Sequence, residues 1–363
     1  MDKLKVAIIG AGTIGHCHAA AYRKLADVEL VAVCDTNRDR AERFARQYDI
    51  PLVFDRHEAL LQQAAPDAVS VCVWNSLHAP VSIDALNAGA HVLCEKPLAL
   101  DAEQALDMQR TAERRDRTLM PGFCTRFEDG VRLLKTYVDE QRLGSLYYIK
   151  ATYLRRRGNP GGWFSDRSRS GGGPIIDLGV HVLDLARFIG GGRAISVYAV
   201  SHKMPDNPAG SYAPHMSADA GGLHDVEDFA SALIRLDNGI AIQFETSWNH
   251  HIESDVFQLE AYGTKGGASV YPKLRIATDD LGALSNVQPI HSNHEDNPNY
   301  DFDMEIAHFI RVVRGSETPL CTAEDGVENM RVTDAIYRSA QERREIVIDR
   351  PRANDETKEV MAK

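Results

Sequence analysis

Residues 5–15, which read KVAIIGAGTIG, decide the fold of the N-terminal third of the chain. The apolar run Lys5–Ile9 is typical of a buried strand, and the segment HCHAAAYRKL after Gly15 predicts a helix. A glycine-rich turn that joins a buried strand directly to a helix indicates a nucleotide-binding unit, whereas the same glycines without this context would carry little weight.

Each residue of the turn has a separate physical task. Gly10 suits a tight turn, Gly12 lets the backbone approach a diphosphate, and Gly15 lets the helix pack closely on the sheet. The start of the helix, at Thr13 and Ile14, offers unpaired N–H groups and the positive end of the helix dipole to phosphate oxygens. The turn therefore predicts a dinucleotide site.

The pattern of strand followed by helix continues to about residue 123. Further strands are predicted at Glu29–Cys34, Ala68–Val73 and His91–Cys94, and helices at Ile14–Leu25, Arg38–Tyr48, Val81–Ala88 and from Asp101 onward. Continuous apolar strands separated by helices indicate a parallel sheet that is covered on both faces. Right-handed crossovers then make the sheet doubly wound, so residues 1–123 are predicted to form an α/β Rossmann domain.

The pattern changes in residues 124–363, for which we predict an α+β domain built on a large, mostly antiparallel, open-faced sheet. One helix is expected near Phe127–Glu140, and strands at Leu146–Tyr153, Ile195–Val200, Phe229–Leu236, Ile240–Trp248 and Val256–Tyr262. Asp237-Asn238-Gly239 predicts a hairpin, because Asn-Gly accepts positive φ at low cost. The polar stretches 201–227 and 278–300 are expected to be long surface loops.

Composition narrows the class of partner and the compartment. The length of 363 residues fits two domains, and a net charge of −11 opposes binding to nucleic acid or to an anionic membrane. The apolar run before Gly10 is too short for a signal peptide or a membrane span. Six cysteines occur singly, with no metal-ligand spacing, so we expect reduced thiols in a cytoplasmic protein without a metal site.

Asp35 ends the second predicted strand and lies 20 residues beyond Gly15. A carboxylate at this place accepts hydrogen bonds from the adenosine ribose and repels a 2′-phosphate, which favours NAD as the cofactor. Arg38 and Arg40 follow closely and could clamp that phosphate, so NADP stays an alternative. Asp35 could also simply cap the next helix.

The segment Cys94-Glu95-Lys96-Pro97 follows the carboxyl end of a predicted strand, the edge at which doubly wound sheets bind ligands. Pro97 holds Lys96 in an extended conformation. A lysine beside a nicotinamide can hydrogen-bond the reacting oxygen, and partial desolvation would lower its pKa. The alternative is a solvated Glu-Lys pair on the surface.

A second reactive segment starts at the loop Gly171-Gly172-Gly173 and enters a predicted helix. On this helix Asp177, His181 and Asp184 follow the spacing i, i+4, i+7 and would share one face. A histidine flanked by two carboxylates is oriented and made more basic, as proton transfer requires. A buried structural network and a three-ligand metal site remain as alternatives.

Taken together, these segments resemble the glucose–fructose oxidoreductase / inositol dehydrogenase / rhizopine-catabolism (Gfo/Idh/MocA) family of NAD(P)-dependent oxidoreductases. The resemblance is carried by GAGTIGHCHAAAY, SLHAPVSIDALNAGAHVLCEKPLAL, GFCTRF and SGGGPIIDLGVHVLDLARFIGG, and it extends over essentially the whole chain. It implies that Lys96, Asp177 and His181 act together on a substrate hydroxyl, with Lys96 or His181 as the primary proton acceptor.

The resemblance also implies roles for residues outside this trio. It places Asn75, His78, Glu95 and Lys96 near the nicotinamide end of the cofactor. Arg126 and Tyr153 would line the substrate side or, as the alternative, lie on the surface of the sheet. For His18 the resemblance implies packing more than chemistry. Trp163, in the arginine-rich segment 155–169, would suit a sugar, because aromatic faces pack on pyranose CH groups while guanidinium groups donate to hydroxyls.

The predicted function is therefore NAD(P)-dependent oxidation of a secondary hydroxyl on a sugar, inositol or related polyol. The resemblance leaves two alternatives: an NAD-dependent glycosidase that works by transient oxidation and elimination, and a non-catalytic NAD-sensing regulator. It also implies a homodimer or homotetramer in which open sheet faces pair between subunits.

Overall fold

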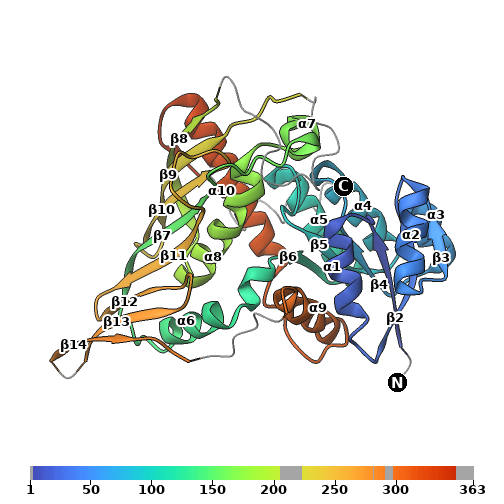
Figure 1. The fold of residues 1–363 in the computed structure, drawn as a ribbon, viewed down its shortest axis with the longest axis horizontal. Helices are drawn as coiled ribbons and strands as arrows, with labels where there is room; N and C mark the ends of the chain where they lie inside the picture. Colours follow the sequence, from blue (N-terminus) through green and yellow to red (C-terminus); the bar gives the residue numbers. More distant parts are fainter. Residues whose placement is uncertain (1–2, 205–222, 281, 291–296, 349–363) are drawn as a thin grey trace, which may run out of the picture.

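The computed structural model describes residues 3–204, 223–280, 282–290 and 297–348, which form two sheets with helices packed around them (Figure 1). The first sheet has the strand order β3-β2-β1-β4-β5-β6, and every neighbouring pair is parallel. Its strands are β1 Leu4–Ile9, β2 Val28–Cys34, β3 Leu52–Phe54, β4 Ala68–Val71, β5 His91–Glu95 and β6 Leu119–Gly122. This order confirms the predicted Rossmann sheet, whose ligand crevice opens where the order reverses between β1 and β4.

The helices of the first sheet are α1 Thr13–Tyr22, α2 Arg38–Tyr48, α3 His57–Ala64, α4 Asn75–Asn87 and α5 Ala102–Arg115. The prediction for α4 was wrong at its start, because the helix begins at Asn75 and contains Pro80. A proline lacks the backbone N–H and is common in the first turn of a helix, so Pro80 favours a helix that starts near it. In the structure the helix starts earlier, because the buried residues Asn75 and His78 form its first turn and their tertiary contacts override that local preference. The short elements β3, α3 and β6 had no clear sequence pattern.

The second sheet has nine strands in the order β14-β13-β12-β11-β7-β10-β9-β8-β15. Its strands are β7 Leu146–Leu154, β8 Ala194–His202, β9 Phe229–Leu236, β10 Ala241–Ser247, β11 Val256–Gly263, β12 Gly266–Ser269, β13 Arg275–Asp280, β14 Ala283–Val287 and β15 Ile346–Val347. All neighbours are antiparallel except β7 and β10, so the predicted mostly antiparallel sheet is confirmed.

The sequence predicted the tight turn between β9 and β10 correctly, but it did not predict the strands within one of the two expected loops. Gly239 has φ of +88° in the tight turn between β9 and β10, as the Asn-Gly signal requires. The expectation of a loop over 278–300 was wrong in part, because β13 and β14 pair across Asp280 and Ala283. For the other predicted loop, 201–227, residues 205–222 lie outside the described residues.

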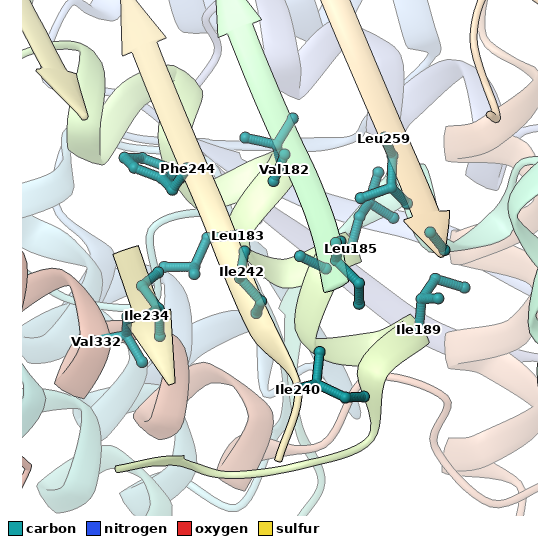
Figure 2. Packing of buried hydrophobic residues seen from close by; sticks show 14 of the residues in the cluster. Val182, Leu183, Leu185, Ile189, Ile234, Ile240, Ile242, Phe244, Leu259 and Val332 are labelled. Atoms are coloured by element: carbon teal, nitrogen blue, oxygen red, sulfur yellow. The ribbon is translucent and has the colours of Figure 1, made fainter. Parts of the chain in front are cut away.

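The core of the second half lies between the nine-stranded sheet and α8 Val180–Gly190. Figure 2 shows Val182, Leu185 and Ile189 of this helix against Ile242 and Leu259 of the sheet. Burying each such side chain stabilises the fold by about 1.5–3 kcal/mol. This packing fixes the helix that follows the Gly171–Gly173 loop. The helices that precede α8 in this half are η1 Cys124–Phe127, α6 Asp129–Asp139, η2 Gly162–Ser165, α7 Arg167–Ser170 and η3 Ile175–Gly179.

Two C-terminal helices return to the first sheet (Figure 1). Helix α9 Tyr300–Val313 joins the same hydrophobic cluster as α1, through Ile306 and Phe309. Helix α10 Ala323–Glu342 contributes to the cores of both halves, with Met330 on one side and Ile336 on the other. The division at residue 123 therefore stays a prediction about folding units. Among the described residues, no helix is long and apolar enough to span a bilayer.

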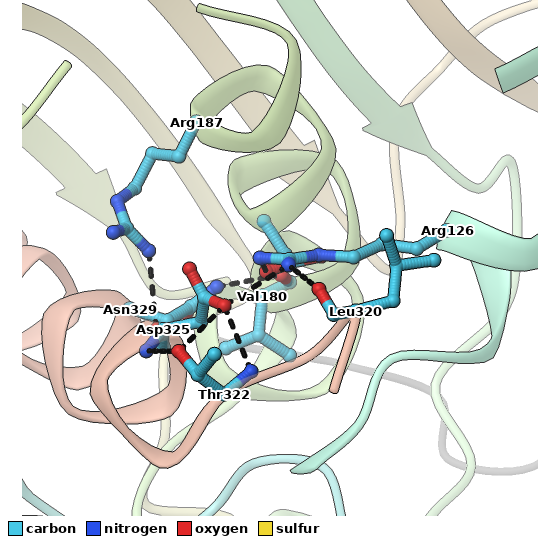
Figure 3. A network of polar contacts seen from close by, with 8 residues as sticks. Arg126, Val180, Arg187, Leu320, Thr322, Asp325 and Asn329 are labelled. Atoms are coloured by element: carbon cyan, nitrogen blue, oxygen red, sulfur yellow. Dashed lines mark hydrogen bonds and ion pairs between the residues drawn. The ribbon is translucent and has the colours of Figure 1, made fainter. Parts of the chain in front are cut away.

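A buried polar network joins η1, α8 and α10 (Figure 3). Arg126 has an exposed fraction of only 2% and makes a bidentate ion pair with Asp184, at 2.7 Å for each contact. Its remaining nitrogen donates to the Leu320 carbonyl and to Asp325. All three guanidinium nitrogens are thus used inside the protein, which contradicts the prediction that Arg126 binds the substrate.

We expect Arg126→Met to destabilise the protein by about 3–5 kcal/mol, because it leaves Asp184 buried without its cation. Urea denaturation measures the loss, and Arg132→Met, at an exposed position on α6, should leave the midpoint almost unchanged. If Arg126→Met instead weakened sugar binding at unchanged stability, Arg126 would be a substrate ligand after all.

Candidate active site

The Gly-rich turn is packed so that only its middle glycine faces open space. A Cβ on Gly10, which has φ of +105°, would lie 2.2 Å from the Cys72 carbonyl oxygen, and one on Gly15 would lie 2.2 Å from the Gly10 oxygen. A Cβ on Gly12 would meet nothing within 4 Å. No side chain of the described residues caps the start of α1, so the helix end next to Thr13 and Ile14 suits a diphosphate.

Asp35 is held at the mouth of the same crevice. Its carboxylate accepts hydrogen bonds from the N–H groups of Ala11, at 3.0 Å, and Asn37, at 2.8 Å. Arg40 donates two further bonds, at 2.9 and 2.7 Å. The cap of α2 is Asn37, so Asp35 is not the helix cap. Arg40 is therefore already paired with the residue that we expect to bind the ribose.

Lys96 and Asp177 connect the two halves of the chain. The Lys96 Nζ donates to the Asp177 carbonyl oxygen at 3.0 Å and to Oδ1 at 3.4 Å. The other carboxylate oxygen, Oδ2, accepts a hydrogen bond of 2.9 Å from the indole Nε1 of Trp248. Trp248 is fully buried. Its position at the end of a predicted strand did not indicate this contact with Asp177. Asp177 is thus fixed from both sides.

The segment that carries Asp177, His181 and Asp184 is not one regular α-helix, contrary to the prediction. The segment Ile175–Gly179 is one turn of π-helix, and the α-helix starts only at Val180, so the angular spacing between the three residues differs from that of an α-helix. Asp184 pairs with Arg126 as described above. No sequence pattern predicted this π-helical turn. Turns of this kind are often found at functional sites.

His181 differs from the prediction in its electrostatics as well. Burial, followed by the positive charges of Lys96 and Arg155, holds the pKa of His181 well below its usual value. The prediction of a more basic histidine was therefore wrong, because the carboxylates that should flank it have other partners. The Nδ1 of His181 is buried and has no hydrogen-bond partner among the described residues. A neutral imidazole of this kind can accept a proton near neutral pH.

Glu227 anchors the loop that leads into the π-turn. Its buried carboxylate accepts hydrogen bonds from the N–H groups of Gly173, at 3.0 and 3.1 Å, and Ile175, at 3.1 Å. Tyr337 donates a further bond of 3.0 Å. Burial raises the pKa of Glu227. No sequence signal indicated this residue, because its partners are backbone groups more than 50 positions away.

Three residues expected near the nicotinamide have partners within the protein. Asn75 donates to the Ser170 carbonyl at 2.7 Å, and this contact leaves its predicted role at the cofactor untested. Both ring nitrogens of His78 face carbonyl oxygens, those of Pro97 and Val73, and its predicted role at the cofactor is likewise untested.

Glu95 also turns inward. Its Oε1 is 2.9 Å from His18 Nε2, and His18 Nδ1 is 2.9 Å from Ser70 Oγ, so the buried His18 joins two polar residues inside the protein. The other oxygen of Glu95 accepts from the Lys96 N–H. Burial alone would raise the pKa of Glu95, but the hydrogen bond and charge of His18 and the charge of Lys96 outweigh it and lower the value. Glu95 therefore supports the turn before Lys96, and its predicted contact with the cofactor stays a prediction.

Glu305 completes a buried cluster with His18 and Glu95, whose potential ligand atoms lie within 4.8 Å of one another. Both carboxylate oxygens of Glu305 are buried and have no hydrogen-bond partner among the described residues. Burial, with the nearby charge of Glu95, raises the pKa of Glu305 well above its usual value. A neutral carboxylic acid explains this arrangement without a cation.

Of the two aromatic residues predicted on the substrate side, Tyr153 packs directly against a small buried cluster, whereas Trp163 stacks on a residue that does so. Tyr153 has its ring centre 6.4 Å from that of His181, and Arg155 donates to its hydroxyl at 3.2 Å. Trp163 stacks on Phe164 with a centroid distance of 3.9 Å. Tyr153 and Phe164 both pack against Leu178 and Trp248. Their predicted contacts with a substrate remain predictions.

The fold and the turn define an oxidoreductase with an NAD-binding Rossmann fold. Residues 4–123 match the family model described as "Oxidoreductase family, NAD-binding Rossmann fold", and residues 131–269 match the GFO/IDH/MocA C-terminal domain. The chain belongs to the Gfo/Idh/MocA family.

Curated relatives and solved structures agree with this assignment. The chain is 36% identical to D-glucoside 3-dehydrogenase of Escherichia coli K12 over 93% of this chain and 95% of the relative. It is 28% identical to inositol 2-dehydrogenase of Rhizobium meliloti over 95% of this chain and 99% of that protein. The structure of levoglucosan dehydrogenase with NADH has a TM-score of 0.84 at 24% identity, covering 96% and 100% of the two chains, which shows the shared fold.

The charges around His181 predict the pH dependence of turnover. Replacing Arg155 by Gln removes a positive charge that lowers the pKa of His181, so that pKa should rise. The acid limb of the kcat/KM profile should therefore move to higher pH. Arg157→Gln, at an exposed position two residues away, is the matched control and should leave the limb in place. An acid limb that stays fixed or moves to lower pH in Arg155→Gln would show that His181 is not the titrating base.

Proposed function

We propose that this protein is an NAD-dependent dehydrogenase that oxidises a secondary hydroxyl of a sugar, with a glycoside as the preferred substrate, or of a related polyol. The proposal rests on one juxtaposition: Lys96 Nζ, 3.0 Å from the Asp177 carbonyl, with the neutral His181 one turn further along. This group lies at the carboxyl edge of the sheet that carries the Gly-rich turn. The 36% identity to D-glucoside 3-dehydrogenase supports a glycoside as the substrate.

The side chains divide the reaction between them. NAD, when bound, supplies the acceptor for the hydride that leaves the carbinol carbon. His181 takes the hydroxyl proton as the carbonyl forms, because its low pKa keeps it unprotonated. The Lys96 ammonium hydrogen-bonds the same oxygen and stabilises the negative charge that develops on it. Asp177 fixes the position of Lys96 through the contacts described above.

A panel of substrates tests this function. Methyl glucosides, free aldoses, inositols and sugar acids are each incubated with NAD and with NADP, and the formation of reduced cofactor and of the keto product is followed. We expect stoichiometric reduction of NAD with at least one glycoside, and loss of turnover by a factor of about 10² or more in Lys96→Met and His181→Ala. Both variants should still bind NAD.

The same panel separates the two alternatives. A glycosidase that uses transient oxidation would release the aglycone without net reduction of NAD. A regulator would bind NAD and show no turnover in the panel, and Lys96→Met would retain its full biological function. Either result would replace the proposed dehydrogenase.

Asp35 is expected to set the preference for NAD over NADP. Asp35→Ser removes the carboxylate and frees Arg40 for a 2′-phosphate, so the ratio of kcat/KM for NAD to that for NADP should fall by about tenfold or more. Asp39→Ser removes an exposed acid in the first turn of α2, next to Arg40 in the sequence, and serves as the control. An unchanged ratio in Asp35→Ser would exclude Asp35 as the discriminating residue.

We also propose that the protein forms a homodimer or homotetramer in the cytoplasm through the open face of the nine-stranded sheet. Tyr198 and Leu233 are paired across β8 and β9 and expose 50% and 49% of their surface, and Val200 lies two residues along the same face. Leu233→Asp should shift the mass measured by light scattering toward the monomer, whereas Leu52→Asp, on the edge strand of the other sheet, should not. A monomeric wild type would contradict the proposal.

A further inference from the structure

Trp74 is a large apolar side chain that the site described above does not use. It precedes α4 and keeps 41% of its surface exposed. Val71 at the end of β4 pairs with Cys94 of β5, so Trp74 and Lys96 follow neighbouring strands at the same carboxyl edge. An exposed tryptophan at a ligand-binding edge needs an explanation beyond packing.

A row of aromatic rings leads away from Trp74 across the two halves of the chain. The rings of Trp74 and Trp163 are stacked, with centroids 6.4 Å apart and an interplanar angle of 27°. Trp163 stacks in turn on Phe164. The guanidinium of the exposed Arg169 lies over the Trp74 ring at 4.7 Å from its centre. The hydrogen bond from Asn75 to the Ser170 carbonyl, at 2.7 Å, fastens the segment that carries Trp163 and Arg169 to α4.

The inner end of this row reaches the catalytic group. Phe164 packs against the small cluster that contains Leu178 and Trp248, and Trp248 donates to the Asp177 carboxylate. Tyr153 packs against the same cluster and lies next to His181. Aromatic packing is therefore continuous from the residues beside the reacting group to Trp74, which forms its exposed outer end.

A single sugar ring held at Lys96 and His181 would leave the exposed outer end of this aromatic row, at Trp74, uncovered. Aromatic faces stack on flat CH surfaces and other rings, and guanidinium groups donate to hydroxyls, so Trp74, Trp163 and Arg169 suit a second ring. We propose that these three residues form a subsite for the aglycone of a glycoside, and that they favour ring aglycones, whether aromatic or a second sugar, over a methyl group. This inference rests on the proposed function.

The test compares phenyl β-D-glucoside, cellobiose and methyl β-D-glucoside as substrates of the full-length, NAD-saturated protein. Trp74→Ala should lower kcat/KM roughly 3- to 10-fold for the two substrates with a ring aglycone, through KM and not kcat, and should change the methyl glucoside little. Trp74→Phe should restore most of the loss. Leu77→Ala, which removes another exposed apolar side chain from the first turns of α4, is the matched control and should have no effect.

Other outcomes would overturn the subsite. An equal loss for all three substrates would assign Trp74 to the general stability of the site, and a rise confined to the KM for NAD would make it part of the cofactor cover. If the wild type oxidised none of the three substrates, the proposed function would fail. Calorimetric titration of phenyl β-D-glucoside into the NAD-bound wild type and into the NAD-bound Trp74→Ala variant would then show separately whether the subsite exists. Equal affinities in that titration would then exclude it.

Discussion

The contact between Lys96 and Asp177 is the interaction on which the site depends, because it joins the edge of the Rossmann sheet to the π-turn of the other half. Neither residue could hold its place alone. Glu95 and Pro97 direct the lysine from one side, while Trp248 holds the second carboxylate oxygen of Asp177 from the other. The surrounding polar contacts hold the backbone around the Lys96–Asp177 contact in place, because the chain there forms the π-turn and not a regular α-helix.

Burial then determines how the charges are used. The site contains the cation of Lys96 and that of Arg155, so the buried imidazole of His181 stays neutral and is ready to accept a proton. Burial acts on the carboxyl of Glu305 in the opposite direction and raises its pKa well above the usual value. The Asp177 carboxylate lies against the Lys96 ammonium group, while Asp184 is paired with Arg126.

Much of the fold could be predicted because its signals are local. The Gly-rich turn, the strands around it and the hairpin at Gly239 follow from residues adjacent in the chain. Errors arose where partners are distant: Asp184 was assigned to His181 because nothing in the sequence shows that Arg126, 58 positions earlier, neutralises it. Trp248 was missed for the same reason, since its role depends on a single indole N–H that meets Asp177 only in the folded protein.

The central claim is that Lys96, Asp177 and His181 direct a hydride from a sugar carbon to NAD. The most direct test is single turnover with a methyl glucoside deuterated at every carbinol carbon, followed by mass spectrometry of the reduced cofactor. The account predicts one deuterium at nicotinamide C4 in the wild type, with a slowed rate relative to unlabelled sugar, and none in Lys96→Met over the same time. Reduced cofactor without deuterium, or unchanged transfer in Lys96→Met, would contradict it.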